Sequence, residues 1–248
     1  MIKIAVSGCC GKMGARIIAL AKEDKGIQLS GTVEVSGHPK VGKDAGEVLG
    51  LGTIGVKITD DIAASLKDAD CLIEFTTPQA TLAHLEAAIK YKKAIVIGTT
   101  GVSLEEADKI KSAAKDIPIL FSPNMSVGVN VMFDAAGVIA RQLGGGYKVE
   151  IVEAHHIQKK DAPSGTAKKL VEIISSARGI GPQEIPVHSI RAGDIVGDHT
   201  VIYCAQGERI ELTHRAHSRD TFASGALRAA KFLANKKPGL YTMADVLK

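Results

Sequence analysis

One stretch of the chain, residues 153–166 (EAHHIQKKDAPSGT), gathers the side chains that best suit the handling of an anionic small molecule. His155 and His156 can exchange protons near neutral pH, and Lys159 and Lys160 add positive charge. Adjacent residues on a strand point to opposite faces, so at most one histidine of the pair is expected to face a reacting atom. These residue types predict a site that binds an anion and donates a proton to it.

The flanking sequence places this stretch between a strand and a helix. Tyr147–Ala154 is rich in β-branched and apolar residues, which favours a strand. After Ser164, apolar residues recur at helical spacing until Gly179, a residue suited to a helix end. Ser164 is a good N-cap, and the N–H groups of Gly165 and Thr166 would point out of the helix start. Such a helix start is a seat for a carboxylate or phosphate.

Each of these features also has an ordinary structural explanation. A Ser-Gly pair before a helix is usually only a cap, a Lys-Lys pair is usually solvated, and a single histidine is more often structural than catalytic. Their concentration in one loop, with Asp161 and Pro163 fixing its path, favours a functional site.

A second motif lies at the N-terminus. The apolar strand Ile2–Val6 leads into Gly8-x-x-Gly11-x-x-Gly14 and then into a helical pattern. In this order glycines permit a tight turn, let the backbone approach a pyrophosphate, and let helix and strand pack closely. Glu34 ends the next strand, at the distance where dinucleotide folds place a carboxylate on the ribose hydroxyls. The two signals together predict a dinucleotide-binding turn.

The run EAHH-x-x-K-x-DAPSGTA, from Glu153 to Ala167, resembles the signature of the dihydrodipicolinate reductase family, enzymes of the diaminopimelate route to lysine. The resemblance extends over nearly the whole chain. It implies reduction of 4-hydroxy-tetrahydrodipicolinate to tetrahydrodipicolinate with NADH or NADPH. It also implies catalytic roles for Lys159, as proton donor, and His155, as its acid/base partner. The implied ligands of a substrate carboxylate are His156, Ser164, Gly165 and Thr166.

The choice between NADH and NADPH stays open. The family often carries an arginine directly after the acidic residue and another in the glycine turn, whereas this chain has Val35 and Lys12. A carboxylate without a neighbouring arginine disfavours a 2′-phosphate, so NADH is expected to be accepted. Lys12, His38, Lys40 and Lys43 can still supply positive charge for NADPH.

Alternating strands and helices over residues 1–126 predict an α/β fold with an open parallel sheet, whose ligands bind at the carboxyl ends of the strands. Glycine-rich Gly42–Gly55 is expected to be a loop covering the cofactor. The residues expected to bind the cofactor lie in the strand-end turns: Gly8, Cys9, Cys10, Gly11, Lys12, Met13, Glu34, Phe75, Thr76, Gly98, Thr99, Thr100, Pro123, Asn124, Met125 and Ser126.

Two domains are expected. The prediction is a Rossmann-like nucleotide-binding domain formed by residues 1–126 and 218–248, with an inserted α+β substrate-binding and oligomerisation domain over residues 127–217. Gly144–Gly146 is interpreted as a hinge or domain junction. The family resemblance implies return of the C-terminal helix to the nucleotide domain, and a homotetramer.

Composition excludes several classes of protein. The chain has 45% hydrophobic and 23% charged residues and a net charge of +4, which suits a globular protein and is too weak a charge to indicate nucleic-acid binding. Four cysteines without zinc-site spacing predict no metal and a reducing compartment. No stretch is long and apolar enough for a membrane span, so we expect a cytoplasmic protein.

Two other functions fit parts of the sequence. A dinucleotide-sensing regulator would need the glycine turn and Glu34 but not the His/Lys cluster. Another two-domain dehydrogenase, acting on aspartate semialdehyde or homoserine, would not need the signature around Lys159. The complete set of ionisable residues in that signature argues against both.

Overall fold

The computed structural model describes all residues from Met1 to Lys248, which form two compact units. Unit 1 combines Met1–Met125 with Phe222–Lys248, and unit 2 is the continuous segment Ser126–Thr221. The second crossing between units therefore falls after Thr221 rather than before Ser218. No helix of the chain has the length and apolar character needed to span a membrane.

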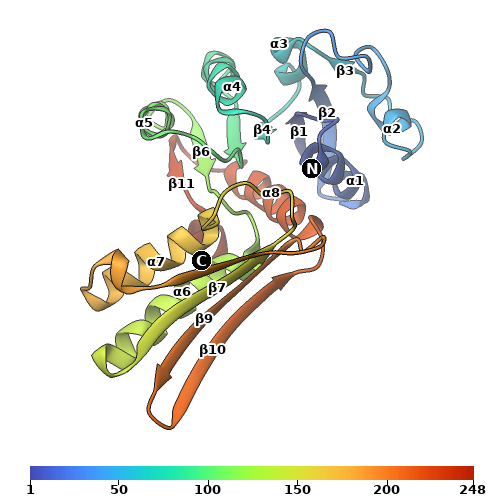
Figure 1. Ribbon diagram of the computed structural model, residues 1–248. Helices are drawn as coiled ribbons and strands as arrows, with labels where there is room; N and C mark the ends of the chain where they lie inside the picture. The colour runs from blue at the N-terminus through green and yellow to red at the C-terminus, as the bar shows by residue number, and fades with distance from the viewer. The chain divides into compact units, whose positions relative to one another are not determined.

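Unit 1 is built on a sheet of seven parallel strands in the order β11-β6-β5-β4-β1-β2-β3 (Figure 1). The order reverses direction between β1 and β4, the switch point at which open α/β sheets bind their ligands. The expected Rossmann-like parallel sheet is thus confirmed. The strands are β1 (Ile2–Ser7), β2 (Ile27–Val33), β3 (Ile58–Thr59), β4 (Cys71–Glu74), β5 (Ala94–Ile97), β6 (Pro118–Phe121) and β11 (Gly239–Tyr241).

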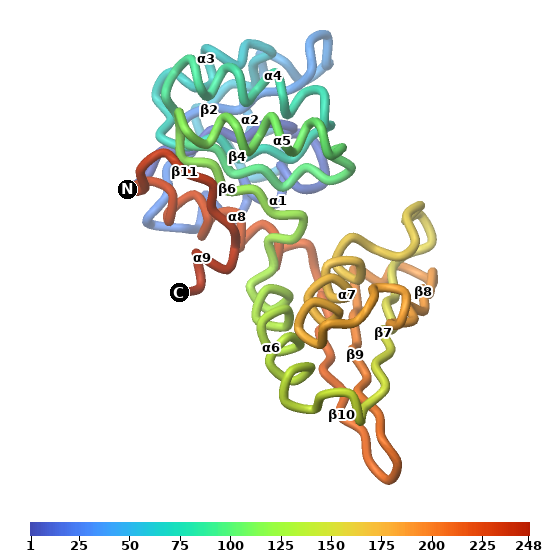
Figure 2. Tube along the Cα trace, turned by 90° about the vertical axis from the view of Figure 1, so that its left-hand side faces the viewer, coloured from blue at the N-terminus to red at the C-terminus, as the bar shows by residue number.

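Helices cover both faces of this sheet (Figures 1 and 2). Those of one face, α3 (Ile62–Leu66), α4 (Pro78–Lys90) and α5 (Leu104–Ala113), share a buried core with β4, β5 and β6. Each begins where a side chain caps its first turn: Asp61, Thr77 and Ser103 accept hydrogen bonds from the backbone. The other helices of unit 1 are α1 (Lys12–Glu23), α2 (Ala45–Val48), α8 (Asp220–Leu233) and α9 (Met243–Leu247).

The segment Gly42–Gly55 is more ordered than a plain loop. It contains α2, because the Asp44 carboxylate accepts hydrogen bonds from four backbone N–H groups, those of Gly46, Glu47, Ile54 and Gly55. The expectation of a featureless loop was wrong for this reason. Short β3, β11 and α9 were not expected either, since two to five residues carry too little periodicity to detect.

Unit 2 packs two helices on one face of a four-stranded sheet in the order β10-β9-β7-β8 (Figure 2). The strands are β7 (Lys148–His155), β8 (Val187–Arg191), β9 (Gly197–Ala205) and β10 (Glu208–Ala216), and only β7 and β8 are parallel. The helices are α6 (Val127–Leu143) and α7 (Gly165–Arg178), which lie side by side. Inside this core the Tyr203 hydroxyl donates to the Ala136 carbonyl oxygen at 2.8 Å.

Gly144–Gly146 forms a 3₁₀ turn between α6 and β7. It lies inside unit 2, so the interpretation of these glycines as a domain junction was wrong. A second 3₁₀ turn, Pro182–Glu184, precedes β8.

Candidate active site

The inward face of β7 carries the centre of the site. Burial alternates along this strand, so Val149, Ile151, Glu153 and His155 all point into unit 2. The antiparallel pairing of β7 with β9 sets Glu153 opposite His199. The apolar inner face of the sheet therefore ends in three polar side chains, two on β7 and one on β9, none of which is exposed.

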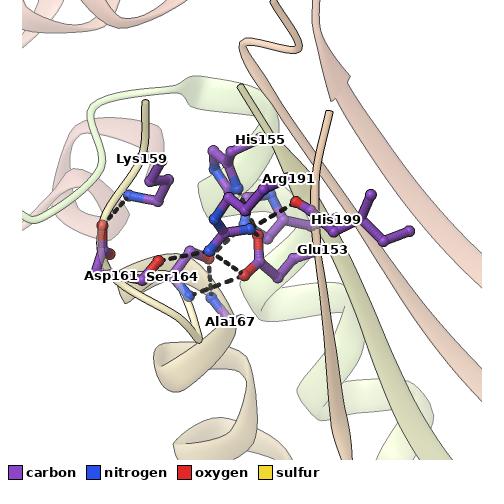
Figure 3. A network of polar contacts seen from close by, with 9 residues as sticks. Glu153, His155, Lys159, Asp161, Ser164, Ala167, Arg191 and His199 are labelled. Atoms are coloured by element: carbon purple, nitrogen blue, oxygen red, sulfur yellow. Dashed lines mark hydrogen bonds and ion pairs between the residues drawn. The ribbon is translucent and has the colours of Figure 1, made fainter. Parts of the chain in front are cut away.

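Glu153 is fully buried and is the hub of these contacts (Figure 3). Its carboxylate oxygens accept hydrogen bonds from Arg191 Nη1 at 2.9 Å and Nη2 at 2.8 Å, and one lies 2.5 Å from His155 Nδ1. The Ser164 N–H also donates to Glu153, at 3.3 Å. Burial opposes ionisation of this carboxyl, but hydrogen bonds from Arg191, Ser189 and His155 outweigh it and lower its pKa to about 2.

His155 is held in one protonation state by these neighbours. Burial lowers its pKa below 6.5, and Glu153 opposes this shift only in part. The guanidinium of Arg191 neutralises the same carboxylate, which is why burial prevails. A neutral His155 donates from Nδ1 to Glu153 and leaves Nε2 as a proton acceptor. A Cβ at position 197 would lie 3.1 Å from Nε2, so Gly197 leaves room for this atom.

The loop after β7 brings Lys159 to the same region. Lys159 Nζ forms an ion pair with the Asp161 carboxylate at 2.8 Å, and its side chain is 23% exposed. The Asp161 carbonyl oxygen accepts from Arg191 Nη2 at 2.5 Å. Arg191 thus ties the lysine-bearing loop to Glu153, and through it to His155 (Figure 3). The Ala162–Pro163 peptide in this loop is cis.

Ser164 joins the start of α7 to the buried histidine of β9. Its hydroxyl accepts from the Ala167 N–H at 3.1 Å as the expected N-cap, and lies 2.9 Å from His199 Nε2. Burial and the nearby His155 ring lower the pKa of His199 to about 3, so His199 is neutral. Its ring meets the ring of His155 edge to face, with 5.1 Å between centroids. The arrangement fixes the helix start against His199, and through it against His155.

The remaining residues expected at the substrate site flank this network. His156 follows β7, and its Nδ1 is buried without a hydrogen-bond partner. Gly165 and Thr166 form the first turn of α7. Lys160 is exposed on the loop.

Three members of the network escaped sequence reasoning as functional residues. Glu153 was read only as part of the signature, and neither Arg191 nor His199 was assigned a functional role. Arg191 and His199 stand 38 and 46 positions after Glu153, and only the strand pairing brings them together. A charged residue within an apolar strand pattern was the available signal for Glu153.

Unit 1 contains a cavity of about 850 Å³ at the carboxyl ends of its strands. Gly8 and Gly11 line it beside Cys10 and Glu34. The glycine turn fits a dinucleotide: Gly8 has φ +66°, and a Cβ on Gly14 would lie 2.2 Å from the Gly8 carbonyl oxygen. No side chain caps the first turn of α1, which leaves its donors suited to a pyrophosphate. Glu34 accepts from the N–H groups of Cys10 and Val35, both at 3.0 Å.

The other residues expected at the cofactor differ in accessibility. Phe75 and Thr76 line the cavity, and the Phe75 ring packs so close to Gly98 that a Cβ there would clash. The Thr76 N–H donates to Thr99 Oγ1 at 3.0 Å. The Cys9 and Met125 side chains are each 1% exposed and do not line the cavity. Lys12, Thr100 and Pro123 are exposed, Met13 and Asn124 are half-buried, and Ser126 is buried as the N-cap of α6 in unit 2.

The cavity also has walls that the sequence did not reveal. Ser36 and Asp60 line it near Glu34, joined by a hydrogen bond of 2.9 Å. His84 lines it from α4, and its Nδ1 lies 2.6 Å from the fully buried Glu74 carboxylate.

The fold and these two sites define the class as an oxidoreductase with a Rossmann-like nucleotide-binding unit. Family models described as dihydrodipicolinate reductase N-terminus and C-terminus match residues 2–125 and 128–247. The proteins named 4-hydroxy-tetrahydrodipicolinate reductase from Syntrophus aciditrophicus (strain SB) and Geotalea uraniireducens (strain Rf4) are each 50% identical to this chain. The alignments cover 100% of this chain and 98% and 99% of those proteins. The chain belongs to the dihydrodipicolinate reductase family.

Solved structures agree on the fold. The dipicolinate-bound dihydrodipicolinate reductase from Paenisporosarcina sp. TG-14 matches with a TM-score of 0.80 and 23% identity, over 98% of this chain and 97% of that one. An amine dehydrogenase from Mycobacterium smegmatis matches with a TM-score of 0.66 and 14% identity, over 98% and 95%.

Proposed function

We propose that this chain reduces 4-hydroxy-tetrahydrodipicolinate to tetrahydrodipicolinate with a reduced nicotinamide dinucleotide, in the diaminopimelate route to lysine. The observation that carries the mechanism is the buried Glu153 carboxylate, which holds a neutral His155 and, through Arg191, the loop of Lys159. The full-length relatives that are 50% identical and carry this name support the reaction.

The substrate is a cyclic imine with two carboxylates, and the start of α7 suits one of them. The N–H groups of Gly165 and Thr166, the Ser164 cap and the unpartnered Nδ1 of His156 supply donors and the positive end of the helix dipole. Binding there fixes the ring without using Lys159.

The bound dinucleotide supplies the hydride. Lys159 gives a proton to the ring as charge develops on its nitrogen and conjugated carbons, which lowers the barrier. Its Asp161 partner is half exposed and can be displaced by the substrate. The 4-hydroxyl group must leave as water before hydride addition. His155 takes up at Nε2 the ring proton released in this elimination and returns it to the departing hydroxyl, because its low pKa keeps it neutral while the Glu153 carboxylate stabilises the imidazolium formed in between.

In the bound cofactor, the glycine turn contacts the pyrophosphate and Glu34 binds the ribose hydroxyls. The remaining strand-end turns surround the nicotinamide. Glu34 and Asp60 bring two carboxylates to the same end of the cavity, and Val35 lies there 67% exposed in place of a cation. A 2′-phosphate would meet repulsion here, so NADH is the preferred cofactor.

The test is a coupled assay in which dihydrodipicolinate synthase makes the substrate in place and loss of reduced-nicotinamide absorbance is followed with NADH and NADPH in parallel. We expect turnover with both and a higher kcat/KM with NADH. Lys159→Ala should lower kcat roughly 100-fold or more, because a positioned proton donor contributes at least that much. Lys160→Ala is the matched control and should leave kcat unchanged. Binding of both dinucleotides without oxidation would favour the sensing regulator instead.

We also propose self-association, as the family resemblance implies. The edge strands of the unit 2 sheet support this through exposed apolar side chains, Ile190 on β8 at 47% and Ile210 on β10 at 41%. Light scattering on the purified chain would give the mass of a tetramer if this is right and that of a monomer if it is wrong.

A further inference from the structure

Two adjacent thiols and a carboxylate meet where the turn after β1 touches the end of β2. The Sγ atoms of Cys9 and Cys10 are 3.9 Å apart. Together with a carboxylate oxygen of Glu34, they form a set of ligand atoms that all lie within 4.8 Å of one another. Cys10 and Glu34 also line the cavity of unit 1, and Cys9 is buried next to them.

The fold assembles this cluster without help from an ion. Parallel pairing of β1 with β2 sets Ser7 beside Val33, so the residues that follow both strands meet at one edge of the sheet. The Gly8 and Cys9 N–H groups donate to the Val33 carbonyl oxygen at 3.0 and 3.4 Å, and the Cys10 N–H donates to Glu34 at 3.0 Å. Glu34 stands 24 positions from Cys10, which is why no metal-site spacing is visible in the sequence.

The geometry suits a tetrahedral ion with thiolate ligands. Zinc–sulfur bonds of about 2.3 Å place two sulfurs of a tetrahedral site roughly 3.8 Å apart. The observed separation of 3.9 Å is close to this value. Glu34 supplies a third ligand from the wall of the cavity.

Thiol ligands select the kind of ion. Soft thiolates favour Zn²⁺ or Cd²⁺ over Mg²⁺ and Ca²⁺. Of these cations, only the thiophilic ones match a site built from two cysteine sulfurs and one carboxylate.

We propose that Cys9, Cys10 and Glu34 form a binding site for a thiophilic divalent cation, and that a cation bound there excludes the nicotinamide dinucleotide. The exclusion rests on the proposed function, in which Glu34 binds the ribose hydroxyls. A carboxylate that ligates a metal ion no longer accepts those hydrogen bonds, and the ion itself occupies the turn that receives the pyrophosphate. The site would make the reductase sensitive to free Zn²⁺ or Cd²⁺.

Titration of the full-length chain with Cd²⁺, followed by the thiolate-to-cadmium charge-transfer absorbance, tests the site. We expect one Cd²⁺ per chain. Cys10→Ser and Cys10→Ala should each weaken Cd²⁺ binding by more than about 100-fold. Removing a residue that only hydrogen-bonds a metal ligand already weakens metal binding by about 10- to 100-fold, and removing the ligand itself should weaken it more. Cys204→Ser is the matched control: Cys204 is an exposed thiol on β9, and its loss should leave the Cd²⁺ affinity unchanged. Circular dichroism would verify that each variant folds.

Equal Cd²⁺ affinity in the unchanged chain and both folded Cys10 variants would overturn the site. Increasing NADH should raise the apparent Kd for Cd²⁺ in proportion, and an apparent Kd independent of NADH would overturn the exclusion. Turnover measured in cation-free buffer reports separately on the proposed function. Absence of turnover together with an intact charge-transfer band would therefore reject the reductase activity while leaving the cation site in place.

Discussion

At the scale of single residues, Glu153 matters because it serves several partners at once. Its carboxylate accepts hydrogen bonds from His155 Nδ1, from both Nη atoms of Arg191 and from the Ser164 N–H. An isolated buried carboxylate would be costly, whereas this one is paired and hydrogen-bonded. The same contacts that keep it ionised also orient the proposed acid–base residue.

Glu153→Gln should therefore lower kcat by roughly 100-fold, because an uncharged amide does not stabilise the His155 imidazolium. The pH profile gives a sharper readout. The acceptor form of His155 exists above its pKa, so activity of the unchanged chain should fall only below pH 6.5. Glu153 raises that pKa, so its removal should move the acid limb of the profile to still lower pH. Steady-state kinetics across pH would measure both effects.

Glu150→Gln is the control for this change. Glu150 lies on the same strand and also pairs with a histidine, His188, at 2.8 Å, but both side chains are more than half exposed. Its removal should leave kcat and the pH profile unchanged. An equal loss in both variants would mean that Glu153 has a purely structural role.

Val35→Arg addresses cofactor choice at one position. A guanidinium beside Glu34 and Asp60 would offset their charge and pair with the 2′-phosphate of NADPH, raising kcat/KM for NADPH about tenfold. Val138→Arg adds the same charge on α6, at another exposed valine, and should change neither cofactor's kcat/KM. A gain with NADH but not NADPH after Val35→Arg would contradict the assignment of this end of the cavity.

At the scale of elements, Ser164 at the start of α7 both caps the helix and contacts the buried His199. Ser164→Ala removes the cap of the helix and the partner of the buried His199 Nε2. We expect a loss of roughly 2 kcal/mol or more, since an unsatisfied buried group adds to the lost cap. Ser103→Ala removes only an exposed cap and should cost about 1 kcal/mol or less. Denaturant unfolding of both variants gives the comparison, and equal losses would argue against the His199 contact.

Most elements were predictable from local pattern, and the exceptions have physical causes. The helix α6, residues 127–143, is one that the sequence predicts well, because its seventeen residues follow a helical apolar pattern after a serine cap. The buried network around Glu153 was predictable from the sequence only in part. His155 and Lys159 stand out by residue type, whereas Arg191 and His199 join them through the pairing of β7 with β8 and β9, which one strand's sequence does not encode.

At the scale of the whole molecule, unit 1 depends on a contact between distant parts of the chain. Gly225 in α8 lies so close to the end of the first segment that an added Cβ would be 1.8 Å from the Met125 carbonyl oxygen. Gly225→Ala should destabilise unit 1 by about 1–3 kcal/mol through overpacking and weaken NADH binding. Gly145→Ala, with no atom within 4 Å of the added methyl group, should change neither. Thermal unfolding and NADH titration would measure both effects. Unchanged stability and NADH affinity in Gly225→Ala would show that α8 can shift to accommodate the methyl group.

The return of the chain to unit 1 has a consequence for biosynthesis on the ribosome. Residues up to Met125 emerge first but lack α8, which starts at Asp220 at the end of the unit 2 segment, and the edge strand β11, which follows α8 in the chain. The continuous segment Ser126–Thr221 has its own core and can complete its folding earlier. Domains usually fold in the order of synthesis. Here unit 2 can fold before the nucleotide-binding unit is complete, although synthesis of that unit starts first.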